Sequence, residues 1–144
     1  MNSIRQREVQ ILLVEDDDVD AETVIRGFRA ARIANTITVA RDGVEALQKL
    51  RGNGKAALPR PNVVLLDLNM PRMNGIEFLQ NLRQDSDFDD TVVFVLTTST
   101  AEEDRIRSYK QHIAGYMVKS EVGPSFKKAV TMLEHYWTTV VLPD

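Results

Sequence analysis

The chain of 144 residues contains no cysteine and only two histidines, and these absences limit its chemistry. Without cysteine there is no disulfide framework, thiol nucleophile or thiolate metal site. His112 and His135 lie far apart in the sequence, so we expect any bound metal to be a hard cation held by oxygen. No run of about 18 apolar residues could span a membrane, and the largely polar start does not resemble a signal peptide. We therefore expect a cytoplasmic protein with no membrane partner.

Positive charge is also not concentrated anywhere in the chain. The 18 basic and 21 acidic residues give a net charge of −3, and the basic ones are scattered, so no nucleic-acid partner is expected. A hydrophobic fraction of 43% is typical of a globular protein. The length fits one domain with a core of its own. We predict a single domain over residues 1–144, with a core at about 9–140, a polar N-terminal tail at 1–8 and a short C-terminal tail at 141–144.

Short apolar runs predict buried strands at residues 10–14, 63–66 and 92–96. Consecutive apolar residues without alternation are typical of strands that are covered on both faces. We expect two more strands, at 36–40 and 116–118, with a helix after every strand. Alternating strands and helices indicate a parallel α/β sheet with right-handed crossovers. The fourth helix should begin with a capping box formed by Thr100 and Glu103, and the last helix near Pro124.

The predicted strands end in side chains that could form one site. Glu15 and Asp16 follow the first strand, and Asp67, Thr97 and Lys119 follow three others. Ligands bind at the carboxyl edge of such sheets, where these residues would meet. Adjacent carboxylates favour a cation between them, and oxygen ligands suit Mg²⁺. Asp67 could then accept a phosphoryl group, although a lone Asp after a strand could instead cap a turn.

The same motifs resemble the receiver domain of two-component response regulators over nearly the whole chain. The resemblance is carried by Leu13–Asp16, by Leu66–Pro71 with Asn74-Gly75, by Leu96–Thr98 and by Tyr116–Lys119. It implies a doubly wound, flavodoxin-like sheet of five parallel strands in the order 2-1-3-4-5, with five helices. It also implies that Asp67 is the phosphoacceptor, and that Mg²⁺ is held by Glu15, Asp16, Asp67 and the backbone carbonyl of Asn69. Thr97, Tyr116 and Lys119 would be the switch and phosphate-binding residues.

The function that the resemblance implies is a signalling switch and not a turnover enzyme. A histidine kinase would phosphorylate Asp67, and the interaction surface of the domain would change. Only a short tail follows the last helix, which resembles a stand-alone regulator. The long loop at 51–61, with Thr97–Ser99 and Lys119-Ser120, resembles regulators that serve cyanobacterial phytochromes. Two alternatives stay open: a receiver-fold binding module that is not phosphorylated, and an aspartyl-phosphate phosphatase. Phosphatases of that kind usually carry a second Asp at the position of Asn69, which argues against the second alternative.

Two features differ from the usual family pattern. Family members usually have Pro where this chain has Ser120. A cis Lys119-Ser120 bond would cost about 3 kcal/mol, so we expect a trans bond and a rearranged loop. The last helix also carries a second apolar stripe beside its core stripe, and this second stripe could either extend the core or contact another subunit. We predict a homodimer through Ala129, Met132, Tyr136, Trp137 and Val140.

Overall fold

The structure is a computed structural model that describes residues 8–52, 54–60 and 62–143. In these ranges five parallel strands form one sheet in the order β2-β1-β3-β4-β5, which confirms the predicted fold class. The strands are β1 (Gln10–Val14), β2 (Ile37–Ala40), β3 (Asn62–Leu66), β4 (Val92–Thr97) and β5 (Gly115–Val118). Residues 1–7 of the expected N-terminal tail, and Asp144 of the C-terminal tail, lie outside the described residues.

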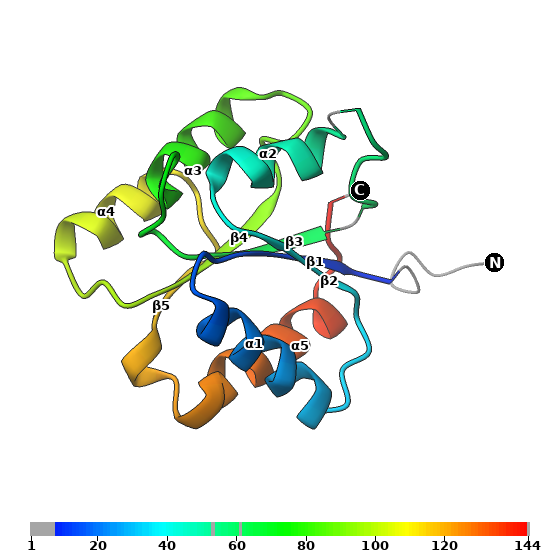
Figure 1. Ribbon diagram of the computed structural model, residues 1–144, viewed down its shortest axis with the longest axis vertical. Coiled ribbons are helices and arrows are strands. Elements are labelled where there is room, and N and C mark those ends of the chain that lie inside the picture. The colour runs from blue at the N-terminus through cyan, green and yellow to red at the C-terminus, as the bar shows by residue number, and fades with distance from the viewer. Residues whose placement is uncertain (1–7, 53, 61, 144) are drawn as a thin grey trace.

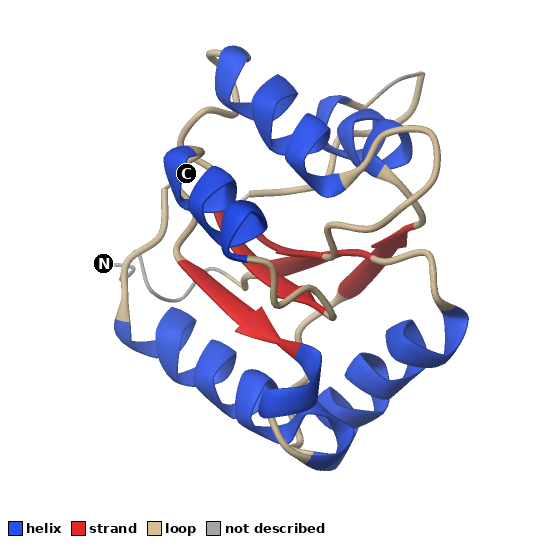
Figure 2. Cartoon of the chain, turned by 90° about the vertical axis from the view of Figure 1, so that its left-hand side faces the viewer, coloured by secondary structure: helices blue, strands red, loops and turns tan. Residues whose placement is uncertain are grey.

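Helices cover both faces of the sheet (Figures 1 and 2). Helices α1 and α5 lie on one face, and α2, α3 and α4 lie on the other. Their bounds are α1 (Asp18–Ala30), α2 (Gly43–Arg51), α3 (Gly75–Gln84), α4 (Glu102–Lys110) and α5 (Lys127–Thr139). Within the described ranges, no helix has the length and apolar character that crossing a membrane requires.

Each central strand supplies side chains to two separate cores. In β1, Ile11 and Leu13 face the core under α1 and α5, whereas Leu12 and Val14 face the core under α2 and α3. All five residues of β3 are buried, because this strand lies in the middle of the sheet. Burying an aliphatic side chain of this size contributes about 1.5–3 kcal/mol, so the apolar runs fix both the strands and their layering.

The helices that follow β1, β2 and β3 begin with a capping side chain. Asp17, Asp42 and Asn74 each accept a hydrogen bond from a backbone N–H in the first turn of α1, α2 and α3. These bonds satisfy amides that have no partner within the helix. The connections that follow these three strands are therefore anchored at the start of the next helix.

The start of α4 differs from the prediction. Its N-cap residue is Ala101, which makes no side-chain cap, so the capping box expected from Thr100 and Glu103 is wrong. Ser99 takes over part of this role: its Oγ accepts a hydrogen bond from the Ala101 N–H at 3.2 Å and donates one to Asp104 at 2.6 Å. The hydroxyl that closes this turn thus lies one residue before the predicted one.

The start of α5 is also displaced. Pro124 begins a 3₁₀ turn (Pro124–Phe126), and the α-helix begins only at Lys127. Ser125 and Phe126 both have a φ of 55°, which is left-handed backbone that cannot continue a right-handed helix.

The residues of the predicted dimer interface fall into two groups. Ala129 and Trp137 are 2% and 8% exposed and belong to the core of the chain itself. Tyr136 packs edge-on against Phe94, with ring centroids 4.9 Å apart, and Met132 packs against the same core. Val140, just past the helix, is 38% exposed. Only Met132, Tyr136 and Val140 therefore keep accessible surface for a partner, and the dimer stays a prediction.

Candidate functional site

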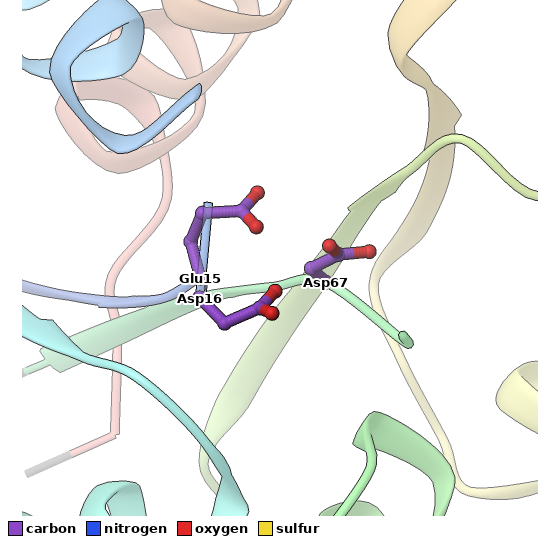
Figure 3. A group of neighbouring side chains, drawn as sticks. All are labelled: Glu15, Asp16 and Asp67. Atoms are coloured by element: carbon purple, nitrogen blue, oxygen red, sulfur yellow. The ribbon is translucent and has the colours of Figure 1, made fainter. Parts of the chain in front are cut away.

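Three carboxylates meet where β1 and β3 end. The register pairs Val14 with Leu66, and the Asp67 N–H donates to the Val14 carbonyl at 2.9 Å. This pairing brings Glu15 and Asp16 beside Asp67, and one oxygen of each lies within 4.8 Å of the others. Figure 3 shows the three carboxyl groups directed to the same side of the strand ends. The predicted rim of acidic side chains is therefore present.

Burial raises the free-energy cost of keeping these three carboxylates charged. Glu15 and Asp67 are buried, and Asp16 is half-buried. A buried carboxylate is costly unless a cation or hydrogen-bond donors compensate its charge. Burial, followed by repulsion from Asp67, raises the pKa of Glu15 from 4.5 to about 7, although hydrogen bonding to Lys119 opposes the shift. A positive charge placed among these oxygens would relieve this strain.

Lys119 enters the cluster from the end of β5 and begins a 3₁₀ turn (Lys119–Glu121). Its Nζ donates to Glu15 Oε1 at 2.6 Å and to Asp20 Oδ2 at 2.7 Å, and lies 3.5 Å from Asp67 Oδ2. Burial alone would lower the pKa of Lys119, but its hydrogen bonds to Asp20 and Glu15 raise that pKa above its ordinary value. Lys119 is therefore a charged ammonium inside the acidic cluster.

Asp67 differs from its neighbours because its contacts are long. Its Oδ1 lies 3.4 Å from the Asn69 N–H, and its Oδ2 lies 3.5 Å from Lys119. Both distances exceed the usual range of a charge-assisted hydrogen bond. Asp67 also faces an open cavity of about 470 Å³, which is lined by Asp16, Asp17, Asp18, Val19, Asp20, Asp67, Asn69, Thr98 and Lys119. Its oxygens therefore remain available for a ligand or a reaction.

The loop after Asp67 is held by the first turn of α3. The Gly75 N–H donates to the Leu68 carbonyl at 2.9 Å. A Cβ at Gly75 would lie 2.6 Å from the Asp67 carbonyl oxygen and 2.7 Å from the Leu68 Cα. Only glycine allows this approach, which explains the Asn74-Gly75 signal in physical terms. The backbone that carries Asp67 and Asn69 is therefore packed directly against α3.

Thr97 ends β4, which pairs with β3, and Tyr116 lies on β5, on the other side of β4. Thr97 is fully buried, two residues past Val95, the residue of β4 that pairs with Leu66. No hydrogen bond among the described residues joins Thr97 to Asp67; the Thr97 Oγ1 accepts instead from the Ser99 N–H at 3.4 Å. The half-buried Tyr116 donates its hydroxyl proton to the Ser99 carbonyl at 3.0 Å. Both predicted switch residues thus contact the turn at Ser99.

Two residues of the site were not identified from the sequence. Thr98, known only as part of a motif, lines the cavity that its buried neighbour Thr97 does not. Asp20, in the first turn of α1, forms a short ion pair with Lys119. Its spacing was the available signal, because residues in the first turn of a helix direct their side chains back toward the N-terminus.

The chemistry of the donor set fits a hard divalent cation. Glu15, Asp16 and Asp67 offer only oxygen atoms, within the distance that one ion could bridge. Mg²⁺ takes oxygen ligands, retains several waters and binds through one or two carboxylates, and the adjoining cavity leaves room for both water and phosphate oxygens. The ammonium of Lys119 beside them would complete a phosphate-binding site.

The comparisons with known proteins agree with this geometry. Residues 11–132 match the family model described as the response regulator receiver domain. The chain therefore belongs to the response regulator receiver domain family. It is 39% identical to Response regulator Rcp1 of Synechocystis sp. over 135 residues, which are 92% of each chain. It is 35% identical to the Probable methanogenesis regulatory protein FilR2 of Methanothrix harundinacea over 127 residues, 88% of this chain and 82% of that one.

Two solved structures are similar to this chain over almost its whole length. The Mn²⁺-bound form of Rcp1 superposes with a TM-score of 0.82 at 37% identity, over 96% of this chain and all of that one. The phosphorylated cyanobacterial phytochrome response regulator RcpA superposes with a TM-score of 0.84 at 30% identity, over the same shares. These matches confirm the expected resemblance to regulators of the phytochrome type.

Proposed function

We propose that the chain is a phosphorylation-controlled switch in which Asp67 accepts a phosphoryl group from the phosphohistidine of a histidine kinase. One observation carries this proposal: the buried Asp67 carboxylate faces an open cavity with only long contacts, while an ammonium lies 3.5 Å away. Related proteins that serve phytochromes suggest a phytochrome-type kinase as the donor.

The transfer requires one displacement at phosphorus. A carboxylate oxygen of Asp67 attacks the phosphorus atom of the phosphohistidine, an O–P bond forms, and the P–N bond breaks. The electron pair of that bond goes to the imidazole nitrogen. Lys119 stabilises the negative charge on the transferred group, because its Nζ already lies beside Oδ2 of Asp67. The product is an acyl phosphate on Asp67.

We propose Mg²⁺ as the metal, held by Glu15, Asp16, Asp67 and the backbone carbonyl of Asn69. When bound, it would neutralise part of the charge on the carboxylates and the phosphoryl oxygens. The carboxylate cluster supports this assignment, as does the Mn²⁺ found in the related Rcp1 structure. Glu15 already uses both oxygens, for Lys119 and for the Asp17 N–H, and would therefore reach the ion through water.

Phosphorylation would act on the rest of the domain through Thr97 and Tyr116. The Thr97 hydroxyl would turn toward a phosphoryl oxygen and release the Ser99 N–H that it now accepts from. Tyr116, which holds the Ser99 carbonyl, would then change position, and the surface formed by α4, β5 and α5 would change with it. The phosphoryl group would shift a population between two states by binding one of them better.

We propose a signalling role and no turnover reaction. An aspartyl-phosphate phosphatase would need a proton-transferring group two residues after the nucleophile, and Asn69 cannot supply it. A binding module that is not phosphorylated would not need the full set of Glu15, Asp16, Asp67, Thr97 and Lys119. The cytoplasmic location and the absence of nucleic-acid partners stay predictions from the sequence.

Labelling of the acceptor tests this function. The purified chain would be incubated with Mg²⁺ and acetyl phosphate, or with a phosphorylated histidine kinase, and its mass measured. We expect one phosphoryl group on the wild type and none on Asp67→Asn. Glu22→Gln is the matched control, because it removes a carboxylate of α1 that is 45% exposed and does not line the cavity. Equal labelling of Asp67→Asn would place the acceptor elsewhere, and continuous consumption of phosphodonor without an adduct would favour an enzyme.

We also propose the homodimer predicted from the second apolar stripe of α5, now through Met132, Tyr136 and Val140. Val140→Asp tests it, because Val140 lies beyond the helix and its replacement leaves the core intact. Val19→Asp is the matched control on a distant valine that is 74% exposed. We expect Val140→Asp to halve the mass in solution and Val19→Asp to leave it unchanged; a wild type with monomer mass would exclude the dimer.

A further inference from the structure

Lys119 is held by more carboxylates than the transfer reaction needs. An ammonium has three N–H donors. Two of them make short bonds, to Glu15 at 2.6 Å and to Asp20 at 2.7 Å, and the third faces Asp67 at 3.5 Å. The two shorter contacts are in the range of strong charge-assisted hydrogen bonds. The position of Nζ is therefore set by Glu15 and Asp20, and only the third N–H donor is left to face Asp67.

The fold frees Asp20 for this contact. Asp20 is the third residue of α1, and its N–H donates to the N-cap Asp17 at 3.0 Å. In a complete capping box its side chain would accept from the Asp17 N–H in return. Here Glu15 Oε2 accepts that proton, at 3.2 Å. The Asp20 carboxylate is not needed to close the helix, and it turns to Lys119 with a side chain that is only 27% exposed.

We propose that Asp20 is a positioning residue for phosphoryl transfer: with Glu15 it occupies two donors of Lys119 and directs the third at the oxygens on Asp67. This inference rests on the proposed function. Without Asp20, the flexible lysine side chain has two ways to leave its position. It can turn toward the open cavity, or it can move onto Asp67 and form a short ion pair that occupies the attacking oxygen. Either movement slows phosphorylation.

The test compares rate constants for phosphorylation by acetyl phosphate, at saturating Mg²⁺, across three variants. We expect phosphorylation of Asp20→Ala to be about tenfold slower than that of the wild type. This decrease is smaller than the decrease in rate that follows when a donor that stabilises the transition state is removed completely. Asp20→Asn should lose less than about threefold, because its amide oxygen still accepts a hydrogen bond. Glu22→Ala, the matched control one turn further along α1, should equal the wild type, because Glu22 pairs with the exposed Arg26 and does not line the cavity. An Asp20→Ala rate that equals or exceeds that of the wild type would overturn the inference.

A second measurement reports the contact itself, without any phosphodonor. The ammonium protons of a buried, hydrogen-bonded lysine exchange slowly, so Lys119 should give a resolved ¹H–¹⁵N ammonium signal that Lys119→Arg removes. We expect Asp20→Ala to broaden or lose this signal and Glu22→Ala to retain it. Retention in Asp20→Ala would contradict the positioning role. If instead the wild type shows the signal but is never phosphorylated, the proposed function fails while the contact stands.

Discussion

The first turns of α1 and α3 follow the two strands that carry the carboxylates, yet they use the same helical position differently. In α3, Asn74 accepts from the Glu77 N–H at 3.0 Å, and Glu77 accepts from the Asn74 N–H at 3.1 Å. In α1, Asp20 occupies the position that corresponds to Glu77, but its carboxylate bonds to Lys119. One third-position acid closes its helix, and the other enters the site.

Because of this difference, the start of α3 contributes mainly to the stability of the fold and the start of α1 mainly to the chemistry of the site. The closed start of α3 packs against the backbone of Asp67 and fixes the loop that follows it. The start of α1 is only half closed by its own residues, because Glu15 supplies the second bond from outside the helix. A change at α3 should therefore act first on folding, and a change at α1 should act first on phosphoryl transfer.

The largest effect should come from Gly75→Ala, in the first turn of α3. The new Cβ would meet backbone atoms 2.6 and 2.7 Å away, which cannot be relieved by turning a side chain. We expect a loss of roughly 3 kcal/mol in the free energy of unfolding, measured with urea, together with poor labelling of Asp67. Gly27→Ala in α1 is the control, because its nearest contact is a side-chain atom of Val130 at 3.1 Å and alanine favours the helix. Equal stability of the two variants would show that α3 does not hold this loop.

The next largest effect is a dependence of stability on pH, which arises from Glu15, just before α1. Burial raises the pKa of Glu15 from 4.5 to about 7, so the folded protein keeps a proton that the unfolded chain releases between these values. Stability of the metal-free protein should therefore fall as pH rises from about 4.5 to 7, by roughly 2 kcal/mol. Glu15→Gln should remove this slope, and Glu22→Gln, on the exposed side of α1, should retain it. A wild-type stability that rises over the same interval would contradict the shift.

Much of this architecture could be predicted from the sequence, because strand burial and helix spacing are local patterns. The apolar runs located the strands within a residue or two, and a helix follows every strand as the alternation predicted. The starts of α4 and α5 were wrong for reasons that spacing does not encode. Ser99 competes with Thr100 for the cap, and left-handed backbone at Ser125 delays the helix.

The site, like the fold, has residues whose place could be predicted from the sequence and residues whose place could not. Asp16, Asp67 and Lys119 could be predicted to meet, because parallel strands bring their carboxyl ends to one edge. Asp20 and Thr98 could not, because their place depends on how side chains turn once the strands are packed. An acid at the place of Asp20 in the first turn of a helix can stabilise that helix, and the sequence alone cannot distinguish this role from an ion pair with a residue 99 positions away.

The comparison of third-position acids can be tested directly by Glu77→Ala. This change removes half of the capping box, and we expect a loss of about 1 kcal/mol in the free energy of unfolding. The rate of phosphorylation should stay that of the wild type, in contrast to Asp20→Ala. Glu103→Ala is the control, because it is an exposed acid in the first turn of α4, where no side chain caps the helix. A slowed rate in Glu77→Ala would mean that closing α3 and positioning the reacting groups cannot be separated.

The smallest effect should appear at α4, the helix that begins without a capping residue. Ser99→Ala removes the acceptor for the Ala101 N–H and the donor to Asp104, both in a partly exposed turn. We therefore expect a loss of only about 0.5–1 kcal/mol in the free energy of unfolding. Thr100→Ala, at the position that the sequence pattern favours, should have no measurable effect. If Thr100→Ala is instead the more destabilising of the two, the capping box predicted from the sequence forms after all, and the start of α4 is closed in the same way as that of α3.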